Sequence, residues 1–250
     1  MVALKLWFDT RSRFLIGIVV MIFLALLLSW SFYAVNKVMG QNGAGANAKI
    51  GAETKSEVMK VWSSYETIVD AAWYESYGAG MATILAIIMA LGGPLADSQS
   101  VHLTLSLPVR RYRWLVAQVM LTLALTVVMM FVSTAVLLAV GALMGHTYPP
   151  GQAALNVLLS VVPVVAWVGL TLAVGSFALD KARTALIVIP ANFISAILFA
   201  LPVMRAWNMN RLGRPLSMHP VLSWKPFLLL IVCAVGGVAT AAWRYEQRDY

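Results

Sequence analysis

The chain has 250 residues, of which 61% are hydrophobic and only 11% are charged. In an ordinary soluble domain roughly a quarter of the residues are charged, so this composition predicts an integral membrane protein. The net charge of +8 then indicates basic residues that flank membrane spans and orient them, and we expect no nucleic-acid partner. The single cysteine, Cys233, excludes an intrachain disulfide and a thiolate metal cluster.

Apolar runs predict an all-α fold: one transmembrane domain over residues 1–250, with six membrane-spanning helices. A helix needs about 20 apolar residues to cross a hydrocarbon core of ~30 Å. The expected spans are residues 14–35, 77–95, 114–144, 153–179, 184–204 and 226–243. We interpret the first span as an uncleaved anchor, because it is longer than the apolar region of a usual signal peptide. Both termini are expected in the cytosol, with the chain in the inner (cytoplasmic) membrane.

Two more helices are expected at the membrane surface. Leu4, Trp7 and Phe8 share one face beside basic residues, which predicts a short interfacial helix before the first span. Residues 52–74 form an expected amphipathic helix on the outer side, with its charged groups, Asp70 among them, mostly away from the apolar face. The apolar face consists of Val58, Trp62, Tyr65, Val69 and Ala72. We favour a structural role for this helix over substrate binding.

Residues 97–118 read DSQSVHLTLSLPVRRYRWLVAQ and separate two apolar runs. Such a segment cannot lie in lipid as irregular chain, because its backbone and its charges would be unsatisfied there. We expect a short surface helix that ends at Pro108, with Arg110 and Arg111 in water before the third span. Val101 and Leu105 are four residues apart and share one helix face, which could bind a cytosolic protein.

This pattern resembles the permease subunits of ATP-binding-cassette exporters of the second type, which export drugs, peptides, lipids or polysaccharides. The matching positions are an acidic residue, a small hydroxyl, a Leu-Pro-hydrophobic signature and a following arginine. In this chain they are Asp97, Ser100, Leu107-Pro108-Val109 and Arg111. At one position the chain departs from the pattern: a Gly-Lys often found inside the next span is Ala117-Gln118 here.

The resemblance implies that residues 97–108 are a coupling helix, which docks on a separate ATPase subunit. The residues expected to couple the two subunits are Asp97, Ser100, Val101, Leu105, Leu107, Pro108, Arg110 and Arg111. It also implies a pathway between two permease chains, in a homodimer or heterodimer, along the second and fifth spans. Two cytosolic P-loop ATPases would drive export.

The motifs that the chain lacks indicate that it is not itself an enzyme. It has no G-x-x-x-x-G-K-[ST] phosphate cradle, so ATP-Mg would bind to the partner, and we expect no cofactor or metal on this chain. The expected span cores contain no Asp, Glu, Lys, Arg or His, although ion-coupled carriers usually need such groups at depth. No H-E-x-x-H or G-x-S-x-G occurs.

Pro190 and Asn192 interrupt the middle of the fifth expected span. Proline frees backbone carbonyls and kinks a helix, and asparagine can bond to a backbone group or a neighbouring helix. These two residues mark either a helix bend or a contact with a substrate.

A second function class remains open. The same inner surface could hold a cytosolic partner without transport, as in a membrane anchor, an assembly protein or an immunity protein.

Overall fold

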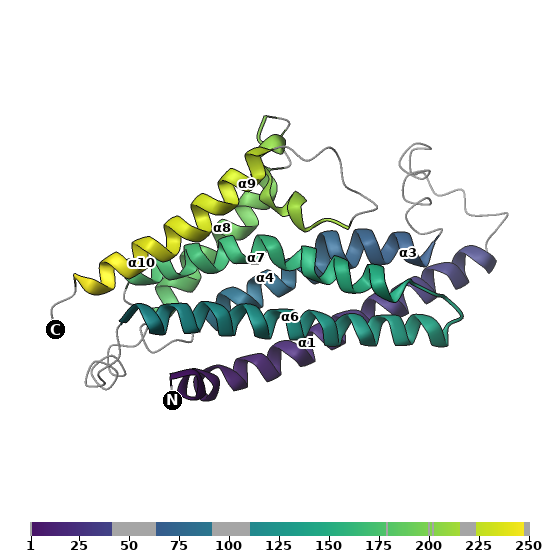
Figure 1. Ribbon diagram of the computed structural model, residues 1–250. Helices are drawn as coiled ribbons and strands as arrows, with labels where there is room; N and C mark the ends of the chain where they lie inside the picture. Colours follow the sequence, from purple (N-terminus) through teal and green to yellow (C-terminus); the bar gives the residue numbers. More distant parts are fainter. Residues whose placement is uncertain are drawn as a thin grey trace.

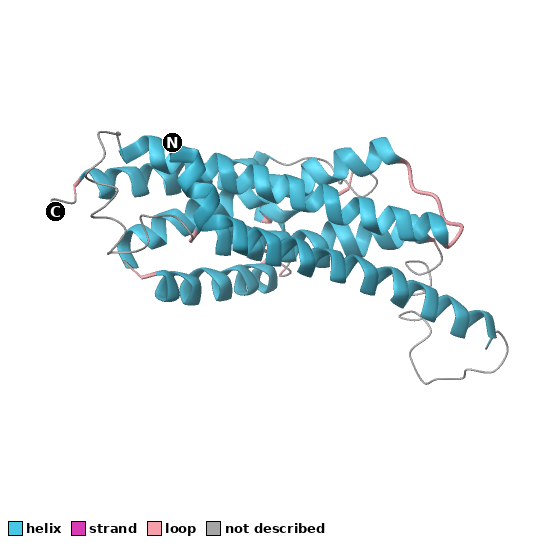
Figure 2. Ribbon diagram, turned by 90° about the horizontal axis from the view of Figure 1, so that it is seen from below, coloured by secondary structure: helices cyan, strands magenta, loops and turns pink. Residues whose placement is uncertain are grey.

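The computed structural model describes residues 2–41, 64–91, 111–178, 180–199, 201, 203–215 and 224–247. This part of the chain is helical with no strand, which confirms the all-α fold, and its long helices lie side by side (Figures 1 and 2). The elements are α1 (Val2–Gln41), α3 (Tyr65–Ile68), the π-helix η1 (Val69–Ser76), α4 (Tyr77–Ala90), α6 (Arg111–Leu143), α7 (Pro150–Ala178), α8 (Lys181–Leu198), the 3-10 helices η3 (Arg205–Trp207) and η4 (Met209–Gly213), α9 (Trp224–Ile231), the π-helix η6 (Val232–Gly236) and α10 (Gly237–Glu246).

Five helical stretches are long and apolar enough to cross a membrane. They are Lys5–Val35, Arg113–Leu143, Pro150–Ala178, Lys181–Leu198 and Trp224–Arg244. These agree with five of the expected spans, and the span at residues 77–95 stays a prediction. There, α4 has 14 residues, about 21 Å at 1.5 Å per residue, which is short of the ~30 Å hydrocarbon core.

The expected interfacial helix at the N-terminus is not a separate element. α1 is one helix of 40 residues, and its first glycine, Gly17, lies inside it. Leu6, Thr10 and Phe14 are all buried, so a single face at four-residue spacing continues from the first turns into the span. Without a proline or a glycine to interrupt this face, the helix has no reason to end near residue 13.

The expected outer helix at 52–74 is described only from residue 64, and from there it packs into the bundle. Tyr65 and Val69 are buried as the apolar pattern predicts. Asp70, expected on another face, is also buried, with an exposed fraction of 5%. The local reason is η1, because a π-helix bonds residue i to i+5 and a spacing of three and four no longer marks one face.

α7 lies at the centre of the bundle and packs against α4, α6, α8, α10 and η4. In its apolar window 61% of the residues are buried, compared with 11% in α8. The closest approach is to α10: a Cβ placed on Gly237 would lie 2.4 Å from the carbonyl carbon of Gly169. Glycine at this contact lets the two backbones touch.

We expect Gly237→Ala to destabilise the bundle, because the added methyl would meet backbone atoms that cannot rotate away. The expected loss in free energy of unfolding is about 1–3 kcal/mol, as for other overpacked sites. Gly236→Ala is the matched control, since a Cβ there meets nothing within 4 Å. Thermal unfolding of both variants in lipid nanodiscs measures the difference, and equal stabilities would contradict the close helix contact.

Candidate functional site

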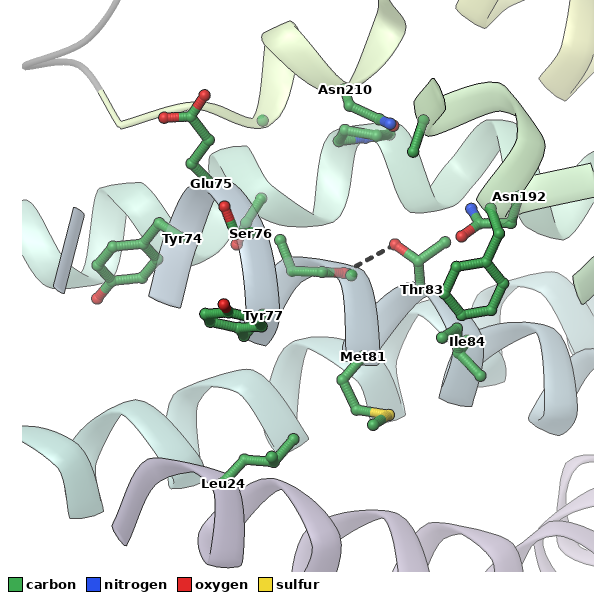
Figure 3. A pocket seen from close by; sticks show the side chains of 17 residues that line it. Leu24, Tyr74, Glu75, Ser76, Tyr77, Met81, Thr83, Ile84, Asn192 and Asn210 are labelled. Atoms are coloured by element: carbon green, nitrogen blue, oxygen red, sulfur yellow. Dashed lines mark hydrogen bonds between the residues drawn. The ribbon is translucent and has the colours of Figure 1, made fainter. Parts of the chain in front are cut away.

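A cavity of about 530 Å³ opens among α1, η1, α4, α7, α8 and η4 (Figure 3). Its wall is mostly apolar and includes Leu24, Met81, Ile84 and Phe193. Ligand sites for small molecules commonly have volumes of about 300–1,000 Å³ and largely apolar walls with few polar groups. The cavity therefore has the size and the composition of a binding site.

The polar groups of the wall come from separate elements. The Thr83 and Ser160 hydroxyls donate to carbonyls one turn earlier in their own helices, at 2.8 Å and 2.9 Å. Asn192 on α8 and Asn210 on η4 add two side-chain amides.

The wall contains the transition from the π-helix η1 to α4, at Ser76. The backbone angles of Ser76, φ −121° and ψ −89°, depart from helical values, although the Tyr77 N–H donates to the Ala72 carbonyl across this residue. Ser76 and its neighbour Tyr77 both line the cavity. At membrane depth irregular backbone is tolerated where it lines a cavity or is covered by protein, and the position of Ser76 agrees with that rule.

A buried polar cluster stabilises η1 next to this cavity. Tyr148, in the turn between α6 and α7, donates its hydroxyl to Asp70 Oδ1 at 2.5 Å. Asn156 Nδ2 donates to the Tyr148 hydroxyl at 2.9 Å. Asp70 is 5% exposed and Asn156 is fully buried. A buried carboxylate is costly unless hydrogen bonds stabilise it, and these donors explain why Asp70 lies inside.

The same cluster keeps Tyr148 protonated. Burial raises the pKa of the Tyr148 hydroxyl well above its ordinary value, and the hydrogen bond to the Asp70 carboxylate raises this pKa further. The turn before it depends on Gly145, whose φ of +82° lies in the left-handed region that glycine adopts most easily. This turn brings Tyr148 back over η1.

Further hydrogen bonds fasten the same helical segment to α6 and α7. The Tyr65 hydroxyl donates to the Leu137 carbonyl at 2.7 Å, and Trp73 Nε1 donates to Thr134 Oγ1 at 3.0 Å. The Tyr74 hydroxyl donates to the carbonyl of Ala153 at 3.3 Å, and Tyr74 also lines the cavity. This side of the cavity wall is therefore well anchored.

An ion pair joins η1 to the end of η4 at the cavity. Glu75 Oε1 pairs with Arg214 Nη2, and the two side chains are 26% and 25% exposed. Glu75 lines the cavity. The preceding Gly213 fits against α7, where a Cβ would lie 2.9 Å from Pro163 Cγ. Asn210 and Gly213 of η4 thus form part of the wall.

Pro190 and Asn192 were predicted to mark either a helix bend or a substrate contact, and they occupy different positions in the structure. Asn192 lines the cavity, as the substrate-contact interpretation expects. Pro190 is exposed and is absent from the wall, and α8 continues through it from Lys181 to Leu198. Among the residues predicted to couple to the ATPase, only Arg111 is described, as the first residue of α6. The other seven, between Asp97 and Arg110, lie outside the described residues.

The helix ends that flank this undescribed segment are fixed to one another. Gln118 of α6, at the position where the resemblance departs, is buried and donates its amide to the Ala90 carbonyl at the end of α4. Arg13 of α1 donates to the nearby Ile88 carbonyl at 2.9 Å. Side chains thereby satisfy carbonyls that the end of α4 leaves without helical partners.

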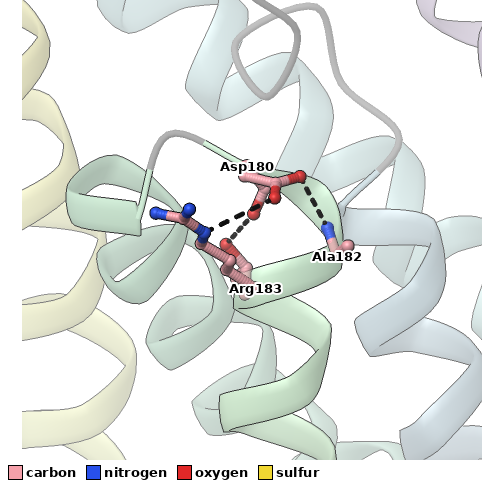
Figure 4. Close-up of polar contacts among 4 residues, drawn as sticks. Asp180, Ala182 and Arg183 are labelled. Atoms are coloured by element: carbon pink, nitrogen blue, oxygen red, sulfur yellow. Dashed lines mark hydrogen bonds and ion pairs between the residues drawn. The ribbon is translucent and has the colours of Figure 1, made fainter.

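The turn between α7 and α8 has a local structural explanation (Figure 4). Asp180 is the N-cap of α8 and its Oδ1 accepts from the Ala182 amide at 3.0 Å. Its Oδ2 lies 3.8 Å from Arg183 Nε in an exposed pair. An aspartate is among the preferred N-cap residues, so Asp180 stabilises the beginning of α8.

Sequence reasoning missed four residues of this region: Asp70, Glu75, Tyr148 and Asn156. Asn156 had the clearest signal, because an amide inside an apolar run needs a hydrogen-bond partner. The partner could not be found in the sequence, since Asp70 lies 86 positions away.

Comparison with known proteins identified no relative of this chain. No protein-family model, curated protein or solved structure matches the chain.

We expect Tyr148→Phe to lower the free energy of unfolding by about 1.5–3 kcal/mol, the range for a hydrogen bond to a charged group. Tyr33→Phe is the control, because Tyr33 is 50% exposed on α1. Chemical unfolding of both variants, and of Asp70→Asn alone and combined with Tyr148→Phe, measures the coupling. Additive effects of Tyr148→Phe and Asp70→Asn would show that the two side chains do not interact.

The raised pKa of Tyr148 also predicts a loss of stability at alkaline pH. Above pH 10.0, the ordinary pKa of tyrosine, the hydroxyl releases its proton in the unfolded state and keeps it in the folded state. This ionisation lowers the free energy of the unfolded state and therefore destabilises the fold. This contribution to stability is complete below pH 10 and is lost above it. The free energy of unfolding, measured between pH 8 and about 11, is expected to fall more steeply with pH for the wild type than for Tyr148→Phe. Parallel curves would contradict this.

Proposed function

We propose that the chain is the transmembrane subunit of an ATP-binding-cassette exporter, driven by separate cytosolic ATPase subunits. The observation that carries the proposal is the position of α4. One part of α4 lines the cavity through Tyr77, Met81 and Ile84, and its end at Ala90 leads into the segment that resembles a coupling helix, residues 97–108. A docked ATPase would thus act directly on a cavity wall.

The contacts at the end of α4 support a mechanical connection. Gln118 joins the Ala90 carbonyl to α6, and Arg13 joins the Ile88 carbonyl to α1. A displacement of residues 97–108 would therefore move α4, α6 and the beginning of α1 together. The distorted backbone at Ser76 marks the transition from the hydrogen-bonded η1 to α4, and we propose that α4 moves about this point while the other side of the cavity stays fixed.

The proposed assembly contains two permease chains and two P-loop ATPases, which bind ATP-Mg. α8 exposes Leu186, Phe193 and Ile197, and such an apolar face suits membrane lipid or a second permease. We place the chain in the cytoplasmic membrane with both termini inside. At the end of the bundle proposed to be cytosolic lie the beginning of α1, the beginning of α6 and the end of α10 (Figure 1). The first turns of α1 and α6 contain Arg11, Arg13 and Arg113, as expected for a cytosolic side.

The test is purification of the tagged full-length chain from its host in mild detergent, with co-purified proteins and ATPase activity measured together. A stoichiometric P-loop ATPase supports the exporter. A chain that comes out alone or with other partners, also after crosslinking, contradicts it and favours a membrane anchor or an assembly or immunity protein.

We expect Leu105→Asp and Arg111→Glu to uncouple ATP hydrolysis from transport while the protein still inserts. Loss of a central interface contact weakens binding by about tenfold or more. Glu66→Lys is the control, because Glu66 is an exposed residue of α3 and lies at the opposite end of the bundle from the beginning of α6 (Figure 1). Reconstituted transport and ATPase rates measure the effect, and wild-type coupling in both variants would contradict the coupling helix.

A further inference from the structure

We propose that the cavity binds a cationic amphiphile, whose ammonium group replaces Arg214 as the partner of the Glu75 carboxylate. As a statement about the exported substrate, this inference rests on the proposed function. As a statement about binding, it concerns this chain alone.

The charge of the wall favours a cation. Among the described residues that line the cavity, Glu75 is the one that is charged at neutral pH, and Arg214, its partner, is not part of the lining. A carboxylate in a mostly apolar site attracts a positive group and repels an anion, and both effects are stronger than in water. Asn210 and Asn192 can add hydrogen bonds to an ammonium through their side-chain oxygens.

The distribution of polar groups favours an amphiphile. Glu75 and Asn210 lie toward one side of the cavity, and Leu24 and Met81 lie toward the opposite side (Figure 3). A ligand with an ammonium at one end and an apolar body at the other would satisfy both sides. A small inorganic cation would leave the apolar side without contacts.

The existing ion pair can be exchanged. Both side chains remain about a quarter exposed, so water reaches the pair. The Arg214 guanidinium occupies the position that a ligand cation would take, and the ligand ammonium would replace its contact with the Glu75 carboxylate. Since Arg214 directly follows η4, exchange would also release η4 from η1.

An apolar ligand has a route to the site. Tyr77 of α4 and Phe193 of α8 line the cavity and are 69% and 55% exposed. The cavity therefore opens on the apolar outer face of the bundle, where an amphiphile dissolved in the membrane would arrive.

The test uses the full-length chain in phosphatidylcholine nanodiscs and two fluorescent probes, dansylcadaverine and its N-acetylated derivative. The probes share the fluorophore and the linker, and only the first has an ammonium. We expect saturable binding of dansylcadaverine above that of empty nanodiscs, and binding of the neutral probe weaker by about tenfold, as for the loss of a hydrogen bond to a charged group. Equal affinities would overturn the proposal.

Variants of the chain test whether the Glu75 carboxylate is the charge that binds the ammonium group of the probe. Glu75→Gln should weaken dansylcadaverine binding by about tenfold, whereas Glu66→Gln, a change in an exposed carboxylate, should leave it unchanged. Arg214→Gln removes the competing cation and should tighten binding. This second variant keeps the proposal falsifiable if Glu75→Gln is unstable, because weaker or unchanged binding to Arg214→Gln would also overturn it.

The two proposals can fail separately. Charge-dependent binding in a chain that co-purifies with no ATPase would leave this inference standing and contradict the exporter. An ATPase complex whose chain does not distinguish the two probes would support the exporter and overturn the cationic ligand.

Discussion

The close contact between α7 and α10 is the constraint on which the bundle depends. In lipid, helices gain little from apolar burial alone, and association relies on close packing and interhelical hydrogen bonds. Gly169 and Gly237 let these two backbones touch, and α7 is then surrounded by α4, α6, α8 and η4 as well. This central helix contributes Ser160 and Pro163 to the cavity wall, and α4, α8, η1 and η4, which form most of the remaining wall, pack against it.

Hydrogen bonds divide the surroundings of the cavity into a fixed part and a less restrained part. Asp70, Tyr148 and Asn156 form a buried cluster that ties η1 to α7 and to the preceding turn. On the other side of Ser76, α4 is held at its far end by side chains of α1 and α6. The cavity therefore lies between a segment anchored by buried hydrogen bonds and a helix whose far end is held by side chains of α1 and α6.

The exposed face of α8 distinguishes this chain from a closed bundle. Only 11% of its apolar window is buried, although Asn192 on the same helix faces the cavity. A helix with one polar cavity contact and a wide apolar outer face fits a site at the border between protein and membrane. The cavity belongs to one chain, so ligand binding and chain association can be examined independently.

The sequence by itself determined the class of the fold and most of its helices. Long apolar runs without charges must be helical in lipid, because no other structure satisfies an isolated stretch of backbone, and this argument depends only on local composition. The same argument did not predict that α1 continues through residue 13 as one helix. It also did not predict the π-helical turns of η1, which change the face that carries Asp70.

Only the tertiary structure decided which polar residues act together. Asp70 and Tyr148 are 78 positions apart, and Glu75 and Arg214 are 139 positions apart. Pro190 and Asn192 were both predicted to mark a helix bend or a substrate contact, and Asn192 lines the cavity while Pro190 does not. Residues two apart on a helix lie on nearly opposite sides, and the sequence did not show which side faces the cavity. Periodicity places residues on a face, but the partner of that face depends on packing between helices, which local patterns do not encode.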